Sequence, residues 1–193
     1  DVVVREVDQD RLDKGVGRIE KQLARAVGKG RIEQADAEAV RGRITPTLEY
    51  GDLADSDLVI EAITEDLPRK LEMWGEVDGL VKPDAFLATN TSSLPVIDQA
   101  AATSRPDRFL GLHFFNPVQV MKLLEVIRGV TTSDEALAVG MAFGQKLGKL
   151  TVQTRDTAGF IVNRLLVPYL LDGIRAYEEG VGSIAQIDDA MKG

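Results

Sequence analysis

The sequence contains no cysteine and only one histidine among its 193 residues. The absence of cysteine excludes a disulfide framework, a thiolate nucleophile and a thiolate metal site. A metal centre built from several imidazoles is excluded as well, so we expect no metal in this chain. Any acid–base chemistry that uses an imidazole near neutral pH must therefore use His113.

Basic residues are also scarce, with 23 lysines and arginines against 31 aspartates and glutamates, which gives a formal net charge of −8. This acidic balance argues against a nucleic-acid-binding surface. The apolar runs are too short to cross a bilayer, and no secretory signal pattern is visible. We therefore expect a cytoplasmic protein that has neither nucleic acid nor a membrane as a partner.

Short apolar runs alternate with amphipathic stretches along most of the chain. Between positions 11 and 29, for example, apolar residues recur every three or four positions, which predicts a helix. We predict strands at 2–7, 43–45, 57–63, 85–89, 108–115, 121–127 and 150–154, and helices at 11–29, 33–40, 67–81, 94–102 and 134–147. Pro46 is expected to end the second strand. The alternation predicts an α/β fold with a doubly wound, mostly parallel, Rossmann-like sheet.

The pattern changes after residue 155. Only helices are predicted from there on, over 160–178 and 183–191, and no strand follows Thr154. We therefore place a domain boundary near residues 155–157. Residues 1–155 are interpreted as a nucleotide-binding domain and residues 156–193 as the beginning of an all-helical domain.

A doubly wound sheet raises the question of a glycine-rich phosphate loop. Two segments approach the G-x-G-x-x-G pattern, Gly15–Glu20 and Gly180–Ala185, but neither lies between a strand and a helix, as phosphate binding requires. Asp8, at the carboxyl end of the first predicted strand, stands where a dinucleotide fold binds the adenosine ribose. It is either an ordinary helix cap or that acid, in which case the first strand and its glycine loop belong upstream of Asp1.

The single histidine lies on a strand that precedes a second strand with an unusual carboxylate. The alternation of side chains along a strand places His113 on the face of the sheet opposite to that of Leu110 and Leu112. On the following strand Glu125 interrupts an otherwise apolar stripe, and a buried carboxylate needs a partner. The two side chains are a candidate acid–base pair, in which the carboxylate orients the imidazole. The alternative is a core histidine, with Glu125 paired to Lys122 or to an arginine.

Two further polar features are candidates for substrate or cofactor binding. A run of hydroxyl and amide side chains, Thr89–Ser93, follows a predicted strand at the edge where open α/β sheets bind ligands. It could equally be a helix N-cap. Asn163 lies within an apolar predicted helix, where asparagine is unfavourable, so it has either a specific hydrogen-bonding role or partial exposure beside Arg164.

Four segments in the same order resemble L-3-hydroxyacyl-CoA dehydrogenases, most closely the short-chain 3-hydroxybutyryl-CoA type, and the resemblance covers essentially the whole chain. The segments are Asn90–Ser93, His113–Val118, Met121–Val126 and Asp156–Arg164. The resemblance implies an oxidoreductase of fatty acid metabolism that moves a hydride between NAD and C3 of an (S)-3-hydroxyacyl-CoA. An acidic ribose-binding residue at Asp8 would favour NAD over NADP.

The resemblance also implies individual roles. His113 would be the general base, and Glu125 would orient it. Ser92 and Asn163 would bind the reacting end of the substrate. The positions that match cofactor contacts are Asp8, Glu65, Lys70, Asn90, Ser92 and Asn116. Lys29 falls near a position that contacts the CoA phosphate, and the complete protein is expected to be a homodimer.

Two departures from the family leave alternatives open. The family's first strand and glycine loop are not in this sequence, and its helical domain is only begun, so we expect low activity and low stability from the chain alone. A non-catalytic derivative that keeps the fold to bind CoA esters or to assemble is therefore a second hypothesis. A dehydrogenase of free hydroxy acids is less favoured, since no arginine pair flanks His113 to bind a carboxylate.

Overall fold

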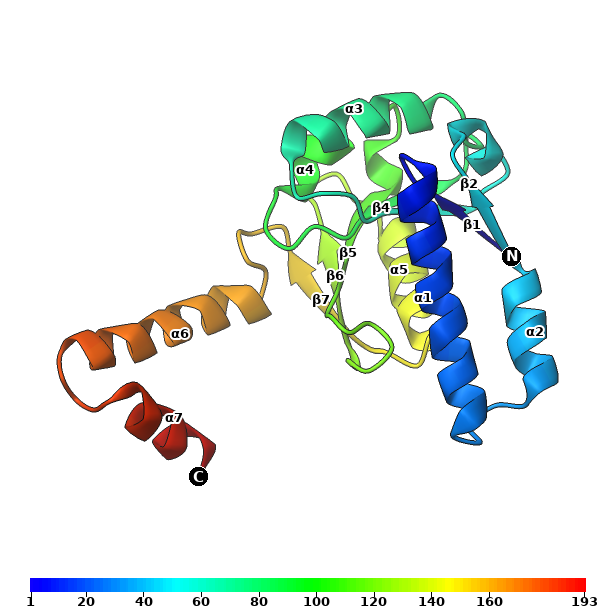
Figure 1. Cartoon of the computed structure of the whole chain (residues 1–193). Helices are drawn as coiled ribbons and strands as arrows, with labels where there is room; N and C mark the ends of the chain where they lie inside the picture. The colour runs from blue at the N-terminus through cyan, green and yellow to red at the C-terminus, as the bar shows by residue number, and fades with distance from the viewer. The chain divides into compact units, whose positions relative to one another are not determined.

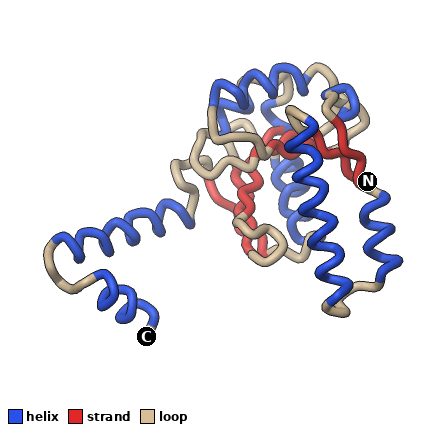
Figure 2. Tube along the Cα trace, viewed as in Figure 1, coloured by secondary structure: helices blue, strands red, loops and turns tan.

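The strands fall into two sheets in the computed structural model, which describes residues 1–193. The chain divides into two compact units, an N-terminal unit of residues 1–57 and 75–85 and a C-terminal unit of residues 58–74 and 86–193. Figure 2 shows the alternation of strands and helices that was predicted from the sequence.

The N-terminal unit holds a two-stranded parallel sheet and two helices. Strand β1 (Val2–Arg5) pairs with β2 (Ile44–Thr47), and the connection between them contains helices α1 (Gln9–Gly28) and α2 (Gln34–Gly42). The prediction that Pro46 ends the second strand is wrong, because Pro46 lies within β2 opposite Val4. Strand β2 pairs only with β1, and an edge strand tolerates a residue without a backbone N–H.

The C-terminal unit contains a five-stranded sheet in the order β3-β4-β5-β6-β7. The strands are β3 (Leu58–Glu61), β4 (Phe86–Thr89), β5 (Phe109–Phe114), β6 (Leu123–Arg128) and β7 (Leu150–Arg155). All neighbours are parallel except β5 and β6, which are joined by a short connection and run antiparallel. The predicted mostly parallel sheet is confirmed.

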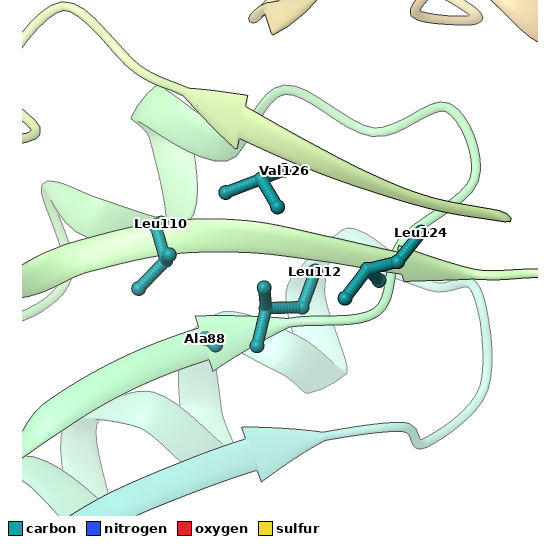
Figure 3. Close-up of a cluster of buried hydrophobic side chains, with 5 residues drawn as sticks. All are labelled: Ala88, Leu110, Leu112, Leu124 and Val126. Carbon is teal, nitrogen blue, oxygen red and sulfur yellow. The ribbon is translucent and has the colours of Figure 1, made fainter. Parts of the chain in front are cut away.

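Helices connect the strands of this sheet (Figure 1). They are α3 (Leu67–Asp78), α4 (Val96–Ala100) and α5 (Asp134–Lys146). One face of the sheet carries a fully buried apolar cluster, drawn in Figure 3, of Ala88, Leu110, Leu112, Leu124 and Val126. Helix α5 lies against this cluster so closely that a Cβ at Gly140 would be 2.4 Å from Leu110 Cδ1. The apolar residues therefore occupy the α5 face, which leaves the alternate residues of β5 and β6 for the other face.

The chain after β7 turns into two helices, α6 (Val162–Glu178) and α7 (Ile184–Lys192). The predicted start of α6 at Phe160 is wrong by two residues, because Phe160 has a φ of 50°, which no α-helical residue adopts. Helix α6 exposes many large apolar side chains, among them Leu165, Tyr169 and Leu170. None of the helices combines the length and the hydrophobicity that spanning a membrane requires.

Candidate active site

His113 and Glu125 stand opposite each other on the antiparallel strands β5 and β6. His113 Nδ1 lies 2.8 Å from Glu125 Oε2. Both residues are buried, with 3% and 1% of their surface exposed. A carboxylate oxygen can only accept a hydrogen bond, so the proton of a neutral imidazole stands on Nδ1 and the lone pair on Nε2. The alternative pairing of Glu125 with Lys122 or an arginine is wrong.

The second oxygen of Glu125 is held by the segment that leads into α6. Glu125 Oε1 accepts hydrogen bonds from the backbone N–H groups of Ile161 and Val162, each at 3.0 Å. These N–H groups belong to the N-cap residue and the first residue of the 17-residue helix α6, where the partial positive charge of the helix favours an anion. Glu125 is therefore fully used as an acceptor although it is inaccessible to water.

The other ring nitrogen of His113 faces the loop after β4. His113 Nε2 lies 3.2 Å from Ser92 Oγ. The Ser92 carbonyl oxygen lies 3.4 Å from Asn163 Nδ2 on the first turn of α6. The four residues predicted as catalytic thus form one connected group. The loop after β4, the β5–β6 pair and α6 each contribute at least one member.

A cavity of about 320 Å³ opens at this group. It lies where β4 and β5 end, which is the edge at which open α/β sheets bind their ligands. Its lining combines amides, a hydroxyl, the imidazole and apolar side chains, contributed by Asn90, Ser92, His113, Phe114, Phe115, Asn116, Val118 and Asn163. None of these residues is an arginine or a lysine.

Beneath the Ser92 loop lies a network of charged side chains. Lys70, whose side chain is 1% exposed, places Nζ 2.6 Å from Glu61 Oε1 and 3.4 Å from Glu65 Oε2. Glu61 also accepts a hydrogen bond from Thr89 Oγ1 at 2.7 Å. The network therefore ties the ends of β3 and β4 to helix α3.

Glu65 shapes the Ser92 loop directly. Its Oε1 accepts hydrogen bonds from Thr91 Oγ1 at 2.5 Å and from the backbone N–H groups of Ser92 at 2.8 Å and Ser93 at 3.1 Å. Partial burial raises the pKa of Glu65, but the Thr91 and Ser92 hydrogen bonds, the charge of Lys70 and the Ser93 hydrogen bond outweigh it. The net result is a pKa below the ordinary value of 4.5.

The other predicted site residues take different positions. Asn90 Oδ1 accepts the backbone N–H of Phe114 at 2.9 Å, which links the ends of β4 and β5, and Asn116 lines the cavity. Asp8 and Lys29 belong to the N-terminal unit, at the two ends of α1. Asp8 caps that helix by accepting the backbone N–H of Arg11 at 2.8 Å. The cofactor and CoA contacts assigned to Asp8, Lys29, Glu65 and Lys70 stay predictions.

Two residues of this region were not identified from the sequence. Glu61 is 3% exposed and anchors Lys70, and the signal for it was a charged residue that closes an apolar strand. Phe160 lies with its ring centroid 5.4 Å from that of His113. A phenylalanine in an apolar segment carries no pattern that distinguishes it from an ordinary core residue.

Comparison with known proteins gives a consistent result. Residues 1–157 match the family model "3-hydroxyacyl-CoA dehydrogenase, NAD binding domain", and residues 159–193 match "3-hydroxyacyl-CoA dehydrogenase, C-terminal domain". The probable 3-hydroxybutyryl-CoA dehydrogenase of Deinococcus radiodurans is 44% identical over 192 residues, which is 100% of this chain and 69% of that protein. The 3-hydroxybutyryl-CoA dehydrogenase of Mycobacterium tuberculosis is 44% identical over 193 residues, 99% of this chain and 68% of that protein.

A solved structure shares the fold. The crystal structure of (S)-3-hydroxybutyryl-CoA dehydrogenase from Ralstonia eutropha aligns with a TM-score of 0.97 at 39% identity, over 100% of this chain and 68% of that one. The chain therefore spans about two thirds of the length of these relatives.

Proposed function

The chain belongs to the 3-hydroxyacyl-CoA dehydrogenase family, and from that premise we propose that it carries the reaction centre of an NAD-dependent 3-hydroxybutyryl-CoA dehydrogenase. The observation that supports this proposal is the position of His113, with Nδ1 fixed by Glu125 and Nε2 directed at the Ser92 hydroxyl beside the cavity. The substrate is proposed to be a short-chain (S)-3-hydroxyacyl-CoA, as in the relatives.

The side chains around the cavity suit a nicotinamide and an acyl group. Amides from Asn90 and Asn116 and the hydroxyl of Ser92 offer donors and acceptors without a fixed charge, beside the apolar Phe115 and Val118. We propose that these polar residues contact the nicotinamide end of NAD. NAD, when bound, supplies the acceptor for the hydride that leaves C3 of the substrate.

His113 performs the proton transfer of the proposed reaction. As the C3–H bond breaks, the C3 hydroxyl becomes a carbonyl, and its proton moves to Nε2 of His113. The positive charge that then develops on the imidazole faces Glu125 at 2.8 Å, which stabilises it. In the reverse direction the same nitrogen returns the proton to the oxygen of the 3-ketoacyl group.

Ser92 and Asn163 orient the reacting oxygen in this proposal. Ser92 Oγ already lies 3.2 Å from His113 Nε2, so an oxygen that hydrogen-bonds to both groups is held at the base. The carboxamide of Asn163 lines the same cavity and stands next to Ser92. Fixing the oxygen at the base before the proton moves removes an orientational part of the barrier.

The lining of the cavity favours a CoA ester over a free hydroxy acid. A free carboxylate is normally bound by arginine or lysine, and the cavity is lined by neither. A thioester carries no charge near its reacting carbon and needs no such partner. We infer that the substrate's charge lies in the CoA part, away from the cavity, and Lys29 is proposed to meet a CoA phosphate.

The domain and assembly assignments are part of the same proposal. Residues 1–155 are proposed as the NAD-binding domain and residues 156–193 as the start of the helical domain, and the two family matches, which meet between residues 157 and 159, support this division. The exposed apolar side chains of α6, such as Leu166 and Leu170, support contact with further helical structure, including a second subunit.

The experiment measures oxidation of NADH by the full-length protein with acetoacetyl-CoA and, in parallel, with acetoacetate. Turnover with acetoacetyl-CoA and at least about a hundredfold lower rate with acetoacetate is expected if the cavity selects an uncharged thioester. Equal rates would overturn the proposed substrate class. Binding of acetoacetyl-CoA without any oxidation of NADH would instead favour the non-catalytic derivative.

A further inference from the structure

The turn between β7 and α6 has an unusual backbone. Gly159 has a φ of 76° and Phe160 a φ of 50°, and Phe160 is the only non-glycine residue with a positive φ. A bulky side chain is disfavoured in this left-handed region. A Cβ at Gly159 would lie 2.9 Å from the backbone nitrogen of Arg164, so the turn also needs glycine there. An aromatic residue kept in such a conformation beside an active site calls for a physical reason.

The turn determines where two backbone N–H groups point. Directly after Phe160, the N–H groups of Ile161 and Val162 converge on Oε1 of Glu125, each at 3.0 Å. With Oε1 occupied by two donors, Oε2 remains for Nδ1 of His113. The left-handed residue therefore lies between the end of β7 and the two donors that orient the carboxylate.

The Phe160 side chain contacts the other partner of the same pair. Phe160 is 2% exposed, and the centroid of its ring lies 5.4 Å from that of the His113 imidazole at an interplanar angle of 57°. The imidazole also contacts the ring of Phe115, at 4.5 Å between centroids. Apolar rings around a charge-assisted hydrogen bond exclude water and strengthen it.

We infer that Phe160 is a positioning residue for the His113–Glu125 pair. Its left-handed backbone directs two N–H groups at Glu125, and its ring covers the imidazole, so that one residue fixes both members. The imidazole is thereby kept in the tautomer with the proton on Nδ1 and the lone pair on Nε2. The effect of Phe160 on proton transfer by His113 rests on the proposed function, whereas its effect on the tautomer does not.

The test compares Phe160→Gly with Phe160→Ala in the full-length protein. Both variants remove the ring, but glycine accepts a positive φ and alanine resists it. After histidine-selective ¹⁵N labelling, the His113 signals are identified by their loss in His113→Gln, and long-range ¹H–¹⁵N spectra report the tautomer of that ring. Tryptophan fluorescence, to which the buried Trp74 contributes, verifies that each variant is folded.

The wild type and Phe160→Gly are expected to hold the proton on Nδ1, whereas Phe160→Ala is expected to lower the population of that tautomer by about twofold or more. Equal tautomer populations in the folded Gly and Ala variants would overturn the inference. Should both fail to fold, Phe160→Leu serves instead: leucine lacks the ring and resists the positive φ as alanine does, so a lower population of the Nδ1 tautomer supports the inference, and a population equal to that of the wild type overturns it.

Kinetics of the full-length protein separate this inference from the proposed function. Phe160→Ala is expected to lower kcat by about tenfold more than Phe160→Gly, with KM for acetoacetyl-CoA changed by less than about twofold in either. A wild-type protein without activity whose tautomer nevertheless responds to Phe160 would refute the proposed function and leave the positioning role intact. An active wild type with no difference between the two variants would support the proposed function and refute the positioning role of Phe160.

Discussion

Glu125 lies directly opposite His113 on the neighbouring strand, and its two carboxylate oxygens bind different partners. One oxygen lies 2.8 Å from Nδ1 of His113, and the other accepts two backbone N–H groups at the start of α6. Three donors thus meet a group that can only accept. The direction of every hydrogen bond around the pair follows from this arrangement, and it leaves Nε2 as the basic nitrogen that faces the cavity.

Glu125→Gln is expected to be nearly inactive despite its small change in shape. A carboxamide has one acceptor and one donor end, so its NH₂ group must face either the α6 N–H groups or Nδ1 of His113. In the first arrangement the NH₂ group and the α6 N–H groups are donors that face each other. In the second the NH₂ group donates to Nδ1, so the imidazole proton moves to Nε2, and Nε2 no longer has a lone pair to act as a base. Steady-state assays are expected to show a fall in kcat of about a hundredfold or more.

The same variant is expected to lose stability, because a buried group is left with a mismatched hydrogen bond. Urea unfolding followed by Trp74 fluorescence should show a loss of about 1–3 kcal/mol. Glu72→Gln, at an exposed position of α3, is the matched control and should change the free energy of unfolding by less than about 0.5 kcal/mol. Wild-type kcat in Glu125→Gln would show that the carboxylate does not set the tautomer.

Glu65→Gln is expected to destabilise the protein in a pH-dependent way. Burial raises the pKa of Glu65, but the hydrogen bonds from Thr91 and Ser92, the charge of Lys70 and the hydrogen bond from Ser93 together hold it below the ordinary value of 4.5. A depressed pKa stabilises the fold above the unfolded-state pKa, and this contribution is lost as pH falls through the folded-state pKa. Because the Glu65 side chain is 39% exposed and solvent screens its charge, the unfolding free energies should differ by less than about 1 kcal/mol near pH 7, and the difference should shrink as pH falls through the folded-state pKa.

The control for Glu65 is Glu178→Gln, at the exposed end of α6, which should show no such pH trend. Glu65→Gln also removes the charged acceptor of the N–H groups in the Ser92 loop. A stability difference that grows towards acidic pH would contradict the assigned sign.

Gly140→Ala is expected to destabilise the sheet that carries the active site. A Cβ at Gly140 would lie 2.4 Å from Leu110 Cδ1 and 3.2 Å from Val126 Cγ1, and both residues are fully buried. Overpacking of this kind costs about 1–3 kcal/mol, which exceeds the gain of about 1 kcal/mol in helix propensity. Urea unfolding measures the net loss.

Gly17→Ala in α1 is the matched helical control. Nothing lies within 4 Å of a Cβ at Gly17, so only the gain in propensity remains and the variant should be more stable by up to about 1 kcal/mol. Equal effects of the two substitutions would show that α5 can move away from β5 and β6.

The sequence alone predicts a large part of this account. Alternation places His113 and Glu125 on the face opposite the apolar cluster, and the two strands pair in the register that brings them together. Both glycine segments that approached a phosphate-loop pattern lie where predicted, one inside α1 and the other after α6. These features follow from local patterns that depend on few neighbours.

Other features depend on contacts between distant residues and were not predictable. The apolar pattern predicts that α6 starts at Phe160. The left-handed turn that delays this start is stabilised by contacts with Glu125, which lies 36 residues before Ile161 in the sequence. The partners of Lys70 were likewise not evident. Nothing in a local pattern shows that a lysine side chain is buried between two glutamates.

The most direct test of the central claim is the rate of NADH oxidation with acetoacetyl-CoA by the full-length protein and its His113→Gln variant. The account predicts turnover in the wild type and a fall in kcat of about 10²–10⁴-fold in the variant, because His113 is the only imidazole among the residues that line the cavity. Tryptophan fluorescence should show that the variant remains folded. A folded His113→Gln protein with wild-type kcat would contradict it.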